Sequence, residues 1–233
     1  MNLAEQLKAG TTKSHSMAEN VTFVKSFLGG VVDIKSYRKL VANLYFIYVA
    51  IEEQMLANKL HPAIKPIYFP ELNRTQSLEQ DLCYYYGDNW KDQISPSNAT
   101  QVYVRRINEI GLNQTELLVA HAYTRYMGDL SGGQILKKIA QNAMHLEDHK
   151  GTKFYDFEAI KNDKEFKSTY RNQLDSIPIT NNQVSDIIAE ANIAFTLNMK
   201  IFQELDSSFI KIIMMLLINA LGSLKLNTKI FSK

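Results

Sequence analysis

The hydrophobic and polar positions along the chain follow a helical period. Between Tyr37 and Leu56, hydrophobic residues recur at intervals of three and four, the spacing of one face of an α-helix. No comparable stretch alternates with the period of two that a half-buried strand shows. The prolines leave residues 1–61, 97–177 and 179–233 free of the strongest helix breaker. The pattern therefore predicts an all-α protein.

Loops are predicted where this period fails. The stretch 61–75 is rich in proline and is predicted to be an irregular connector. Gly87 is predicted to end the helix that follows, because glycine is favoured just beyond a helix end. We find no internal repeat or linker, so we predict one domain over residues 1–233, with 209–233 as a terminal helix or tail. The other predicted helices cover residues 77–86, 99–109, 115–144, 163–174 and 181–205.

Composition limits the compartment and the partners of the protein. A chain of 233 residues can bury a core without disulfides, and its single cysteine, Cys83, indicates a reducing compartment. The net charge of +2 is too even for a protein whose main partner is a nucleic-acid backbone. Any bound anion must therefore be held by a few well-placed cations.

Neither end of the chain carries a predicted targeting or membrane-spanning segment. The first residues lack the apolar stretch of a signal peptide, so we expect a soluble protein that stays where it is made. The apolar run 212–218 is bounded by Lys211 and Asn219 and is shorter than the roughly 20 residues that span a bilayer. We expect a buried, partner-facing or interface-lying helix there, and no transmembrane anchor.

Three glycines interrupt a strongly helical segment, ELLVAHAYTRYMGDLSGGQILKKIAQNAM (116–144). Each glycine inside a helix costs about 1 kcal/mol relative to alanine, so something must require the missing side chains. Gly128 and Gly132 are four residues apart and lie on one helix face. One explanation is a close helix–helix crossing. The other is a flat ligand lying against a helix that bends over it, with the carboxylate of Asp129 near that ligand.

The histidines offer one candidate metal ligand. His15 and Glu19 are four residues apart on one face of a predicted helix. A carboxylate that accepts the hydrogen of one ring nitrogen leaves the other nitrogen free to bind a metal, although a surface or capping histidine is the alternative. His121, in an apolar stretch, is predicted to be a core histidine.

One motif is misleading. The sequence LSGGQ (130–134) matches the signature of ABC-type ATPases, but the chain has no Gly-Lys dipeptide for a phosphate loop. Nucleotide hydrolysis is therefore excluded.

These segments together resemble a known family. The glycine segment is similar to the signature of heme oxygenases, and KSHSMAEN (13–20) is similar to the sequence around their proximal histidine. The likeness continues through LYFIYVAIEEQ (44–54), IYFPELNR (67–74), SLEQDL (77–82), FKSTYR (166–171) and AFTLNMKIFQEL (194–205). It covers nearly the whole chain up to about residue 205.

The resemblance implies a single-domain helical bundle in which heme b is sandwiched between a proximal helix and a kinked distal helix. By position, His15 is the axial ligand of the heme iron and Glu19 is its hydrogen-bonding partner. Asp129 corresponds to the distal carboxylate that holds ordered water. The distal backbone approaches the heme at Gly128, Gly132 and Gly133.

Two further groups of residues follow from the same resemblance. The hydrogen-bond network that supports the distal site comprises Tyr48, Tyr103, Arg125 and Asn198. The heme propionates are bound by Lys8, Tyr123, Lys167 and Arg171. Thr12 stands where the family often has a second basic residue, and Lys13 beside it is a candidate replacement.

The implied activity is oxidative cleavage of heme at one meso carbon, the alpha position, to biliverdin, carbon monoxide and ferrous iron. Heme is then both substrate and cofactor, O2 is the oxidant, and electrons come from an external donor. The residues implied in catalysis are Asp129, Gly128, Gly132, Arg125 and Tyr48.

The chain looks most like heme oxygenases of cyanobacteria and red-algal plastids. This likeness implies ferredoxin, or another reductase, as the electron donor and phycobilin synthesis as the purpose, with a downstream bilin reductase as a further partner. It also implies the cytoplasm of a cyanobacterium or a virus-infected host, or a plastid stroma. An acidic donor is expected to dock on basic side chains, for which Lys8, Lys13, Arg105 and Arg106 are candidates.

Two other functions compete with this one. A protein that stores or senses heme has no need of the carboxylate of Asp129. A helical enzyme of related fold that acts on a thiamin-like substrate has no need of His15.

Overall fold

The computed structural model describes the backbone of residues 2–147 and 150–230, and the side chains of residues 2–147 and 150–205. Within these residues every regular element is a helix and no strand occurs, which confirms the predicted all-α fold. The α-helices are α1 (Leu3–Glu19), α2 (Thr22–Leu28), α3 (Ile34–Ala57), α4 (Thr75–Tyr86), α5 (Asn98–Asn113), α6 (Leu118–Ala122), α7 (Gly128–Met144), α8 (Asp163–Asp175) and α9 (Asn181–Ile230).

Helix α3 lies at the centre of the core. It begins after Asp33, whose side chain accepts a hydrogen bond of 3.0 Å from the backbone nitrogen of Ser36. Its three-and-four pattern buries residues such as Ile47 and Tyr48 completely. Among the described residues α3 is the one helix that is long and apolar enough to cross a membrane, but more than half of its most apolar stretch is buried inside the protein. A core helix accounts for this composition.

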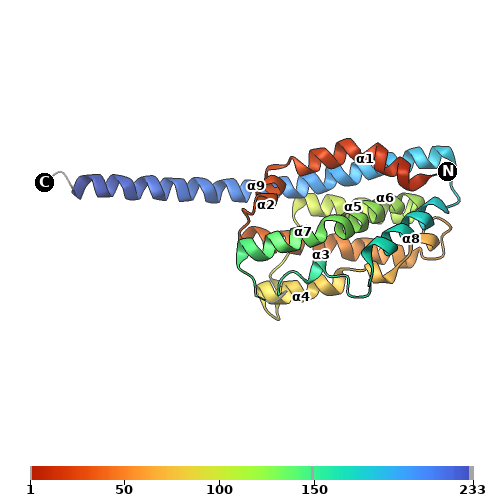
Figure 1. The fold of residues 1–233 in the computed structure, drawn as a ribbon, viewed down its shortest axis with the longest axis horizontal. Coiled ribbons are helices and arrows are strands. Elements are labelled where there is room, and N and C mark those ends of the chain that lie inside the picture. Colours follow the sequence, from red (N-terminus) through yellow and green to blue (C-terminus); the bar gives the residue numbers. More distant parts are fainter. Residues whose placement is uncertain (1, 148–149, 231–233) are drawn as a thin grey trace.

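Helices α1 and α9 lie side by side and form one face of the bundle (Figure 1). Beyond α2, α9 continues as a single helix that projects from the body (Figure 1). The predicted end of this helix at residue 205 is therefore wrong, because the backbone remains helical to Ile230. The side chains of the apolar run 212–218 lie outside the described residues, so its expected surroundings remain a prediction.

The glycine segment is not one regular helix. It begins with a 3-10 turn, η4 (Thr115–Leu117), continues as α6, and passes through a π-helical turn, η5 (Tyr123–Met127), into α7. The change from α to π hydrogen bonding ends directly before Gly128. Such turns are rare and often mark functional sites. The irregularity expected at the glycines is therefore present, one turn earlier than the glycines themselves.

The predicted connectors are confirmed. Residues 61–75 contain two short 3-10 turns, η1 (Lys65–Ile67) and η2 (Pro70–Leu72). Gly87 follows α4 with a φ of +81°, a left-handed conformation that glycine adopts without strain. Two further 3-10 turns are η3 (Trp90–Asp92) and η6 (Lys153–Tyr155).

Candidate functional site

A cavity of about 920 Å³ lies between α1, the π-turn with α7, α8 and α9. The side of α1 that faces it carries His15, and the opposite helix, α7, contributes Gly128 and Gly132. The other lining residues are Asn2, Ala4, Glu5, Lys8, Thr11, Thr12, Glu19, Tyr123, Thr124, Met127, Ser131, Ser168, Arg171, Asn172, Asp175 and Phe195. The structure thus brings the candidate metal ligand and two of the three glycines to one space.

The three glycines have two different surroundings. A Cβ atom added to Gly128 or Gly132 meets no atom within 4 Å, so the missing side chains leave open space there. A Cβ atom added to Gly133 lies 3.3 Å from Cδ1 of Tyr155 in η6. Close packing therefore accounts for Gly133, whereas the open backbone at Gly128 and Gly132 suits a ligand that lies against the helix.

The opposite wall is built around His15. Its Nδ1 atom lies 3.6 Å from Oε1 of Glu19, and both side chains are more than half exposed. The ring of Phe195 meets the imidazole edge-on, with 5.9 Å between the ring centroids. Because the carboxylate faces Nδ1, Nε2 is the nitrogen left for a metal. Phe195 was not predicted, although it lies one helical turn before Asn198 in a segment that the resemblance covers.

Three of the four predicted propionate-binding residues, Lys8, Tyr123 and Arg171, line the cavity. Lys167 is not among the lining residues, and its Nζ lies 3.4 Å from the backbone oxygen of Leu130 in α7. Cations are therefore available at the cavity from both α1 and α8.

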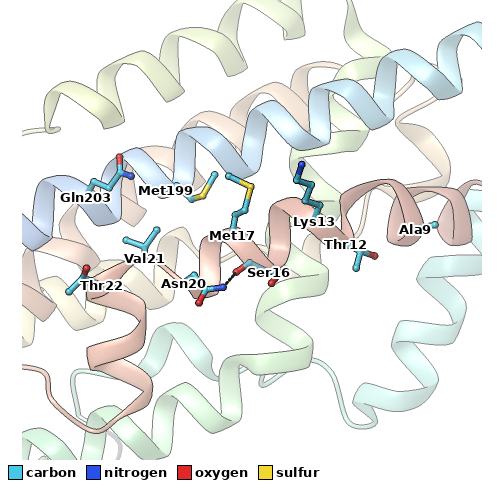
Figure 2. Close-up of a pocket in the computed structure, with 10 residues that line it drawn as sticks. All are labelled: Ala9, Thr12, Lys13, Ser16, Met17, Asn20, Val21, Thr22, Met199 and Gln203. Atoms are coloured by element: carbon cyan, nitrogen blue, oxygen red, sulfur yellow. Dashed lines mark hydrogen bonds between the residues drawn. The ribbon is translucent and has the colours of Figure 1, made fainter.

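Lys13 lies in a different place. It lines a second hollow of about 900 Å³, formed by α1, the start of α2 and α9, together with Met17 and Met199 (Figure 2). Thr12 lines both this hollow and the cavity, and its hydroxyl donates a hydrogen bond to the backbone oxygen of Lys8. Lys13 is thus not positioned in the cavity lining to replace a basic residue at Thr12.

Gly128 and Gly132 form the wall of the cavity opposite His15, here called the glycine wall. Behind it, a hydrogen-bonded group surrounds Asp129, whose side chain is 12% exposed. Tyr48 donates its phenolic hydrogen to Oδ2 of Asp129. Arg125 donates through Nε to the Tyr48 oxygen at 3.0 Å and through Nη1 to Oδ1 of Asn198 at 2.8 Å. Tyr103 lies near the same two side chains: burial raises the pKa of its hydroxyl, while the charge of Arg125 and the amide of Asn198 lower it. Of the four residues predicted for the distal network, Tyr48, Arg125 and Asn198 are therefore linked in series to Asp129, and Tyr103 lies beside them.

Burial raises the pKa of Asp129, while the charge of Arg125 and the hydrogen bond from Tyr48 lower it. The net direction is upward, so this carboxylate binds a proton more readily than an exposed aspartate. Burial likewise raises the pKa of Tyr48 well above its ordinary value, so the phenol remains a donor at neutral pH. The pair can hold a proton beside the glycine wall.

Two contributors to this site were missed. The guanidinium of Arg74 is buried, donates to the backbone oxygen of Asp156 at 2.5 Å, and lowers the pKa of Asp129 by its charge. The hydroxyl of Thr124 is buried, lines the cavity and has no hydrogen-bond partner among the described residues. Since buried hydroxyls are normally paired, a molecule in the cavity is the natural partner for Thr124. Hydrophobic periodicity contains no signal for either role.

Comparison with known proteins gives a consistent result. A family model described as heme oxygenase matches residues 1–204. The chain is 66% identical to a heme oxygenase of Porphyra purpurea over 227 residues, which are 97% of this chain and 96% of that protein. It is 58% identical to heme oxygenase 1 of a Synechocystis strain over 221 residues, 95% of this chain and 92% of that protein.

Solved structures agree with the sequence comparison. Heme oxygenase-1 from the cyanobacterium Synechocystis sp. PCC6803, solved in complex with heme, superposes with a TM-score of 0.92 and covers 95% of this chain and 100% of its own. Heme oxygenase-2 of the same cyanobacterium, solved with heme and NO, is 43% identical with a TM-score of 0.87, over 89% of this chain and 86% of its own.

Proposed function

The chain belongs to the heme oxygenase family, and we propose that it opens the heme ring at the alpha meso carbon to give biliverdin, carbon monoxide and ferrous iron. O2 is the co-substrate, and electrons come from an external donor, because the heme alone cannot supply them. One observation carries the proposal: a single cavity has His15 on one wall and the open backbone of Gly128 and Gly132 on another.

The cavity fits the chemistry of heme. An axial ligand is available at Nε2 of His15, and the planar ring has open space over two glycines. Lys8 and Arg171 offer positive charge for two propionates, and Tyr123 offers a phenolic donor. When bound, heme supplies the iron at which O2 is activated and the ring that is opened.

On the proximal side, Glu19 orients the imidazole of His15. A carboxylate facing Nδ1 keeps the hydrogen on that nitrogen and increases the basicity of Nε2. On the side of the propionates, Lys8, Tyr123 and Arg171 bind from the positions that they already occupy. Lys167 joins them once its Nζ leaves the backbone oxygen of Leu130.

On the distal side, Asp129 holds a water and a proton. Its Oδ2 accepts from Tyr48, and its Oδ1 lies 3.7 Å from Nη2 of Arg125, beyond hydrogen-bond distance, so Oδ1 can still accept from a water molecule. Arg125 donates to Tyr48 and is itself held by Asn198, which accepts from its Nη1. Gly128 and Gly132 let the ring approach the helix backbone. The chain's own contribution to catalysis is therefore a held proton next to one edge of a tightly placed ring.

We propose ferredoxin as the donor and phycobilin synthesis as the pathway, in a cyanobacterial cytoplasm or plastid stroma. The high identity to a red-algal and a cyanobacterial protein supports this choice. A small acidic donor is expected to dock on Lys8, Lys13 and Arg105. Arg106 is less available than expected, because its guanidinium is already bound by Glu190 at 2.6 Å.

The test is to add hemin and then O2 with reduced ferredoxin or ascorbate. A histidine-ligated Soret band that decays as biliverdin absorption grows supports the proposal, and chromatography of the product identifies the meso carbon. A stable ferrous or oxygenated spectrum indicates a heme-binding protein instead. Absence of any Soret shift contradicts both functions. Faster turnover with ferredoxin than with ascorbate, lost at high salt, supports the proposed donor.

A further inference from the structure

Helix α1 is held in the bundle by two unequal halves. In its first half, Leu3 and Leu7 are at most 2% exposed and belong to the hydrophobic core. A backbone nitrogen of its first turn also donates to Oδ1 of Asp175 on α8 at 2.9 Å. Among the described residues of α1, none beyond residue 11 is buried. The second half, which carries His15, therefore depends on other contacts for its position.

The two halves meet at Gly10, where α1 and α9 run side by side (Figure 1). A Cβ atom added to Gly10 lies 2.5 Å from Cγ2 of Ile188 on α9, which is closer than two carbon atoms tolerate. Isoleucine has few rotamers in a helix, so it cannot easily turn away. Gly10 is thus a packing glycine, and a side chain there pushes the two helices apart.

Asn192 on α9 binds this turn of α1. Its Nδ2 donates to the backbone oxygen of Gly10 at 3.1 Å and to that of Ile188 at 2.8 Å. Its Oδ1 accepts from the hydroxyl of Ser14 at 2.5 Å. Both partners of the nitrogen are carbonyls, which only accept, so the amide oxygen has to face the hydroxyl. The orientation of the Asn192 amide is therefore fixed by its partners.

Ser14 makes a hydrogen bond that its neighbours on α1 do not make. The hydroxyls of Thr11 and Thr12 donate to the backbone oxygens four residues earlier in their own helix, at 2.7 and 2.8 Å. For Ser14 the corresponding oxygen is that of Gly10, which accepts from Asn192 instead. The amide is inserted between this hydroxyl and this carbonyl, so a bond that would lie within α1 becomes a bridge to α9.

His15 directly follows the turn that Asn192 binds. Gly10 and Ser14 are four residues apart and share the face of α1 that meets α9. His15 lies about 100° further around the helix and lines the cavity. Phe195, one turn after Asn192 on α9, meets the imidazole edge-on. Helix α9 thus fixes the α1 backbone immediately before the imidazole and also packs against the ring.

We propose that Asn192 is a positioning residue for His15: by bridging Gly10 and Ser14 to α9, it sets the place and the rotation of the α1 turn that presents the imidazole to the heme iron. The inference rests on the proposed function, in which His15 is the axial ligand. Asn192 does not occur among the described residues that line the cavity. It therefore acts through the backbone of α1 and not on the heme itself.

Two variants loosen this bridge in different ways. Asn192→Leu keeps a side chain of similar size that neither donates to Gly10 nor accepts from Ser14. Gly10→Ala leaves the amide intact and separates the helices through its contact with Ile188. Because the two substitutions lie on opposite helices, a shared effect reports on the contact between them.

Two further variants are controls. Thr196→Val removes a hydroxyl that donates to the backbone oxygen of Asn192 within α9, at 2.9 Å, so the bridge to α1 stays in place. Asp175→Ala removes the hydrogen bond to the backbone nitrogen of Ala4, in the first turn of α1. It loosens α1 at the end far from His15, and so tests whether any weakening of this helix has the same result.

The first measurement uses the heme-free protein. Amide hydrogen exchange reports how often each part of a helix opens. In Asn192→Leu the amides of residues 14–19 are expected to exchange about tenfold faster than in the wild type, because the bridge no longer holds them. Those of residues 6–9 are expected to keep their rates, since core packing holds the first half. Thr196→Val is expected to exchange like the wild type throughout α1.

The second measurement uses ferrous, heme-loaded protein, in which resonance Raman spectroscopy records the stretching band of the bond between iron and imidazole. In Asn192→Leu and Gly10→Ala this band is expected to broaden, because the imidazole then occupies a range of positions. Heme affinity is expected to fall by about tenfold in both. Thr196→Val and Asp175→Ala are expected to keep the wild-type band.

Wild-type exchange in Asn192→Leu, or a wild-type band in either bridge variant, overturns the proposal. So does equal broadening in Asp175→Ala, which shows that the band responds to any loosening of α1. If Asn192→Leu does not fold, the band of Gly10→Ala decides. A wild-type protein without histidine-ligated iron contradicts the proposed function, while exchange in the heme-free protein still shows whether Asn192 holds the turn, so the two failures are distinguishable.

Discussion

Tyr48 on α3 donates its phenolic hydrogen to Oδ2 of Asp129 on α7, across 81 positions of sequence. Tyr48 is completely buried, and the Asp129 side chain is 12% exposed. Helix α3 thereby holds Asp129, the only acidic residue in the first turn of α7. The orientation of Asp129 thus depends on the packing of the core as well as on its own helix.

Asp129→Asn is expected to bind heme and to lose biliverdin formation by about a hundredfold, because an amide cannot hold and release a proton. The measurement is single-turnover biliverdin formation after heme affinity has been determined by titration. Tyr48→Phe keeps the carboxylate and removes only its donor, so a smaller loss, of about tenfold, is expected. Wild-type yield in Asp129→Asn contradicts the assigned role.

His15→Ala is expected to abolish the histidine-ligated Soret spectrum, because no other histidine among the described residues lines the cavity. Added imidazole should restore that spectrum by occupying the vacated space. Glu19→Gln, which keeps the ligand and removes the charge facing Nδ1 at 3.6 Å, is expected to weaken heme binding by about tenfold. An unchanged Soret band in His15→Ala shows that another residue binds the iron.

Gly132→Ala and Gly133→Ala form a matched pair on adjacent residues. At Gly132 a Cβ meets nothing within 4 Å, so alanine is expected to stabilise the heme-free protein by up to about 1 kcal/mol while weakening heme binding. At Gly133 the Cβ lies 3.3 Å from buried Tyr155, so alanine is expected to bring no stabilisation and to leave heme affinity unchanged. Thermal unfolding and heme titration check both effects. Equal effects of the two variants contradict the separation of ligand-facing and packing glycines.

The three glycines of this segment show how much of the site the sequence alone could predict. The cost of glycine in a helix indicates that something needs the missing side chains, but the sequence leaves both a helix crossing and a ligand as explanations. The structure assigns the glycines to different explanations. Gly133 packs against Tyr155, whereas Gly128 and Gly132 face open space. That division depends on η6, which lies about 20 residues further along the chain. Periodicity within one helix carries no information about such a neighbour.

Local patterns predicted more of the fold than of the site. The three-and-four spacing over residues 37–56 predicted α3, which in the structure begins three residues earlier, at Ile34 after the capping side chain of Asp33. The burial of His121 was also predicted from its apolar neighbours. Its partner Glu190 lies 69 positions away, and the second partner of that carboxylate, Arg106, lies 84 positions from it. Charged residues at such separations are paired only by tertiary packing, which a single sequence does not specify.

Asp81 on α4 is a buried carboxylate that holds η6 in place. Its two oxygens accept from the backbone nitrogens of Lys153 and Phe154, each at 2.8 Å. Burial raises its pKa to about 7, although both hydrogen bonds lower it. Tyr155 of the same turn packs against Gly133, so Asp81 stabilises the side of α7 that carries Gly133.

The raised pKa of Asp81 predicts a dependence of stability on pH. Between its unfolded pKa, near 4, and about 7, Asp81 is protonated in the folded protein and ionised in the unfolded chain. The folded state therefore binds more protons, so its stability falls as pH rises through this window and is level above about 7. Asp81→Asn lacks this titration. The free energy of unfolding of the wild type, relative to Asp81→Asn, is thus expected to decline from pH 4 to 7 by at most about 4 kcal/mol. Denaturant unfolding across the window measures it, with Asp88→Asn, an exposed residue beside Cys83, as the control. A difference that stays constant with pH, or rises, contradicts the assigned direction.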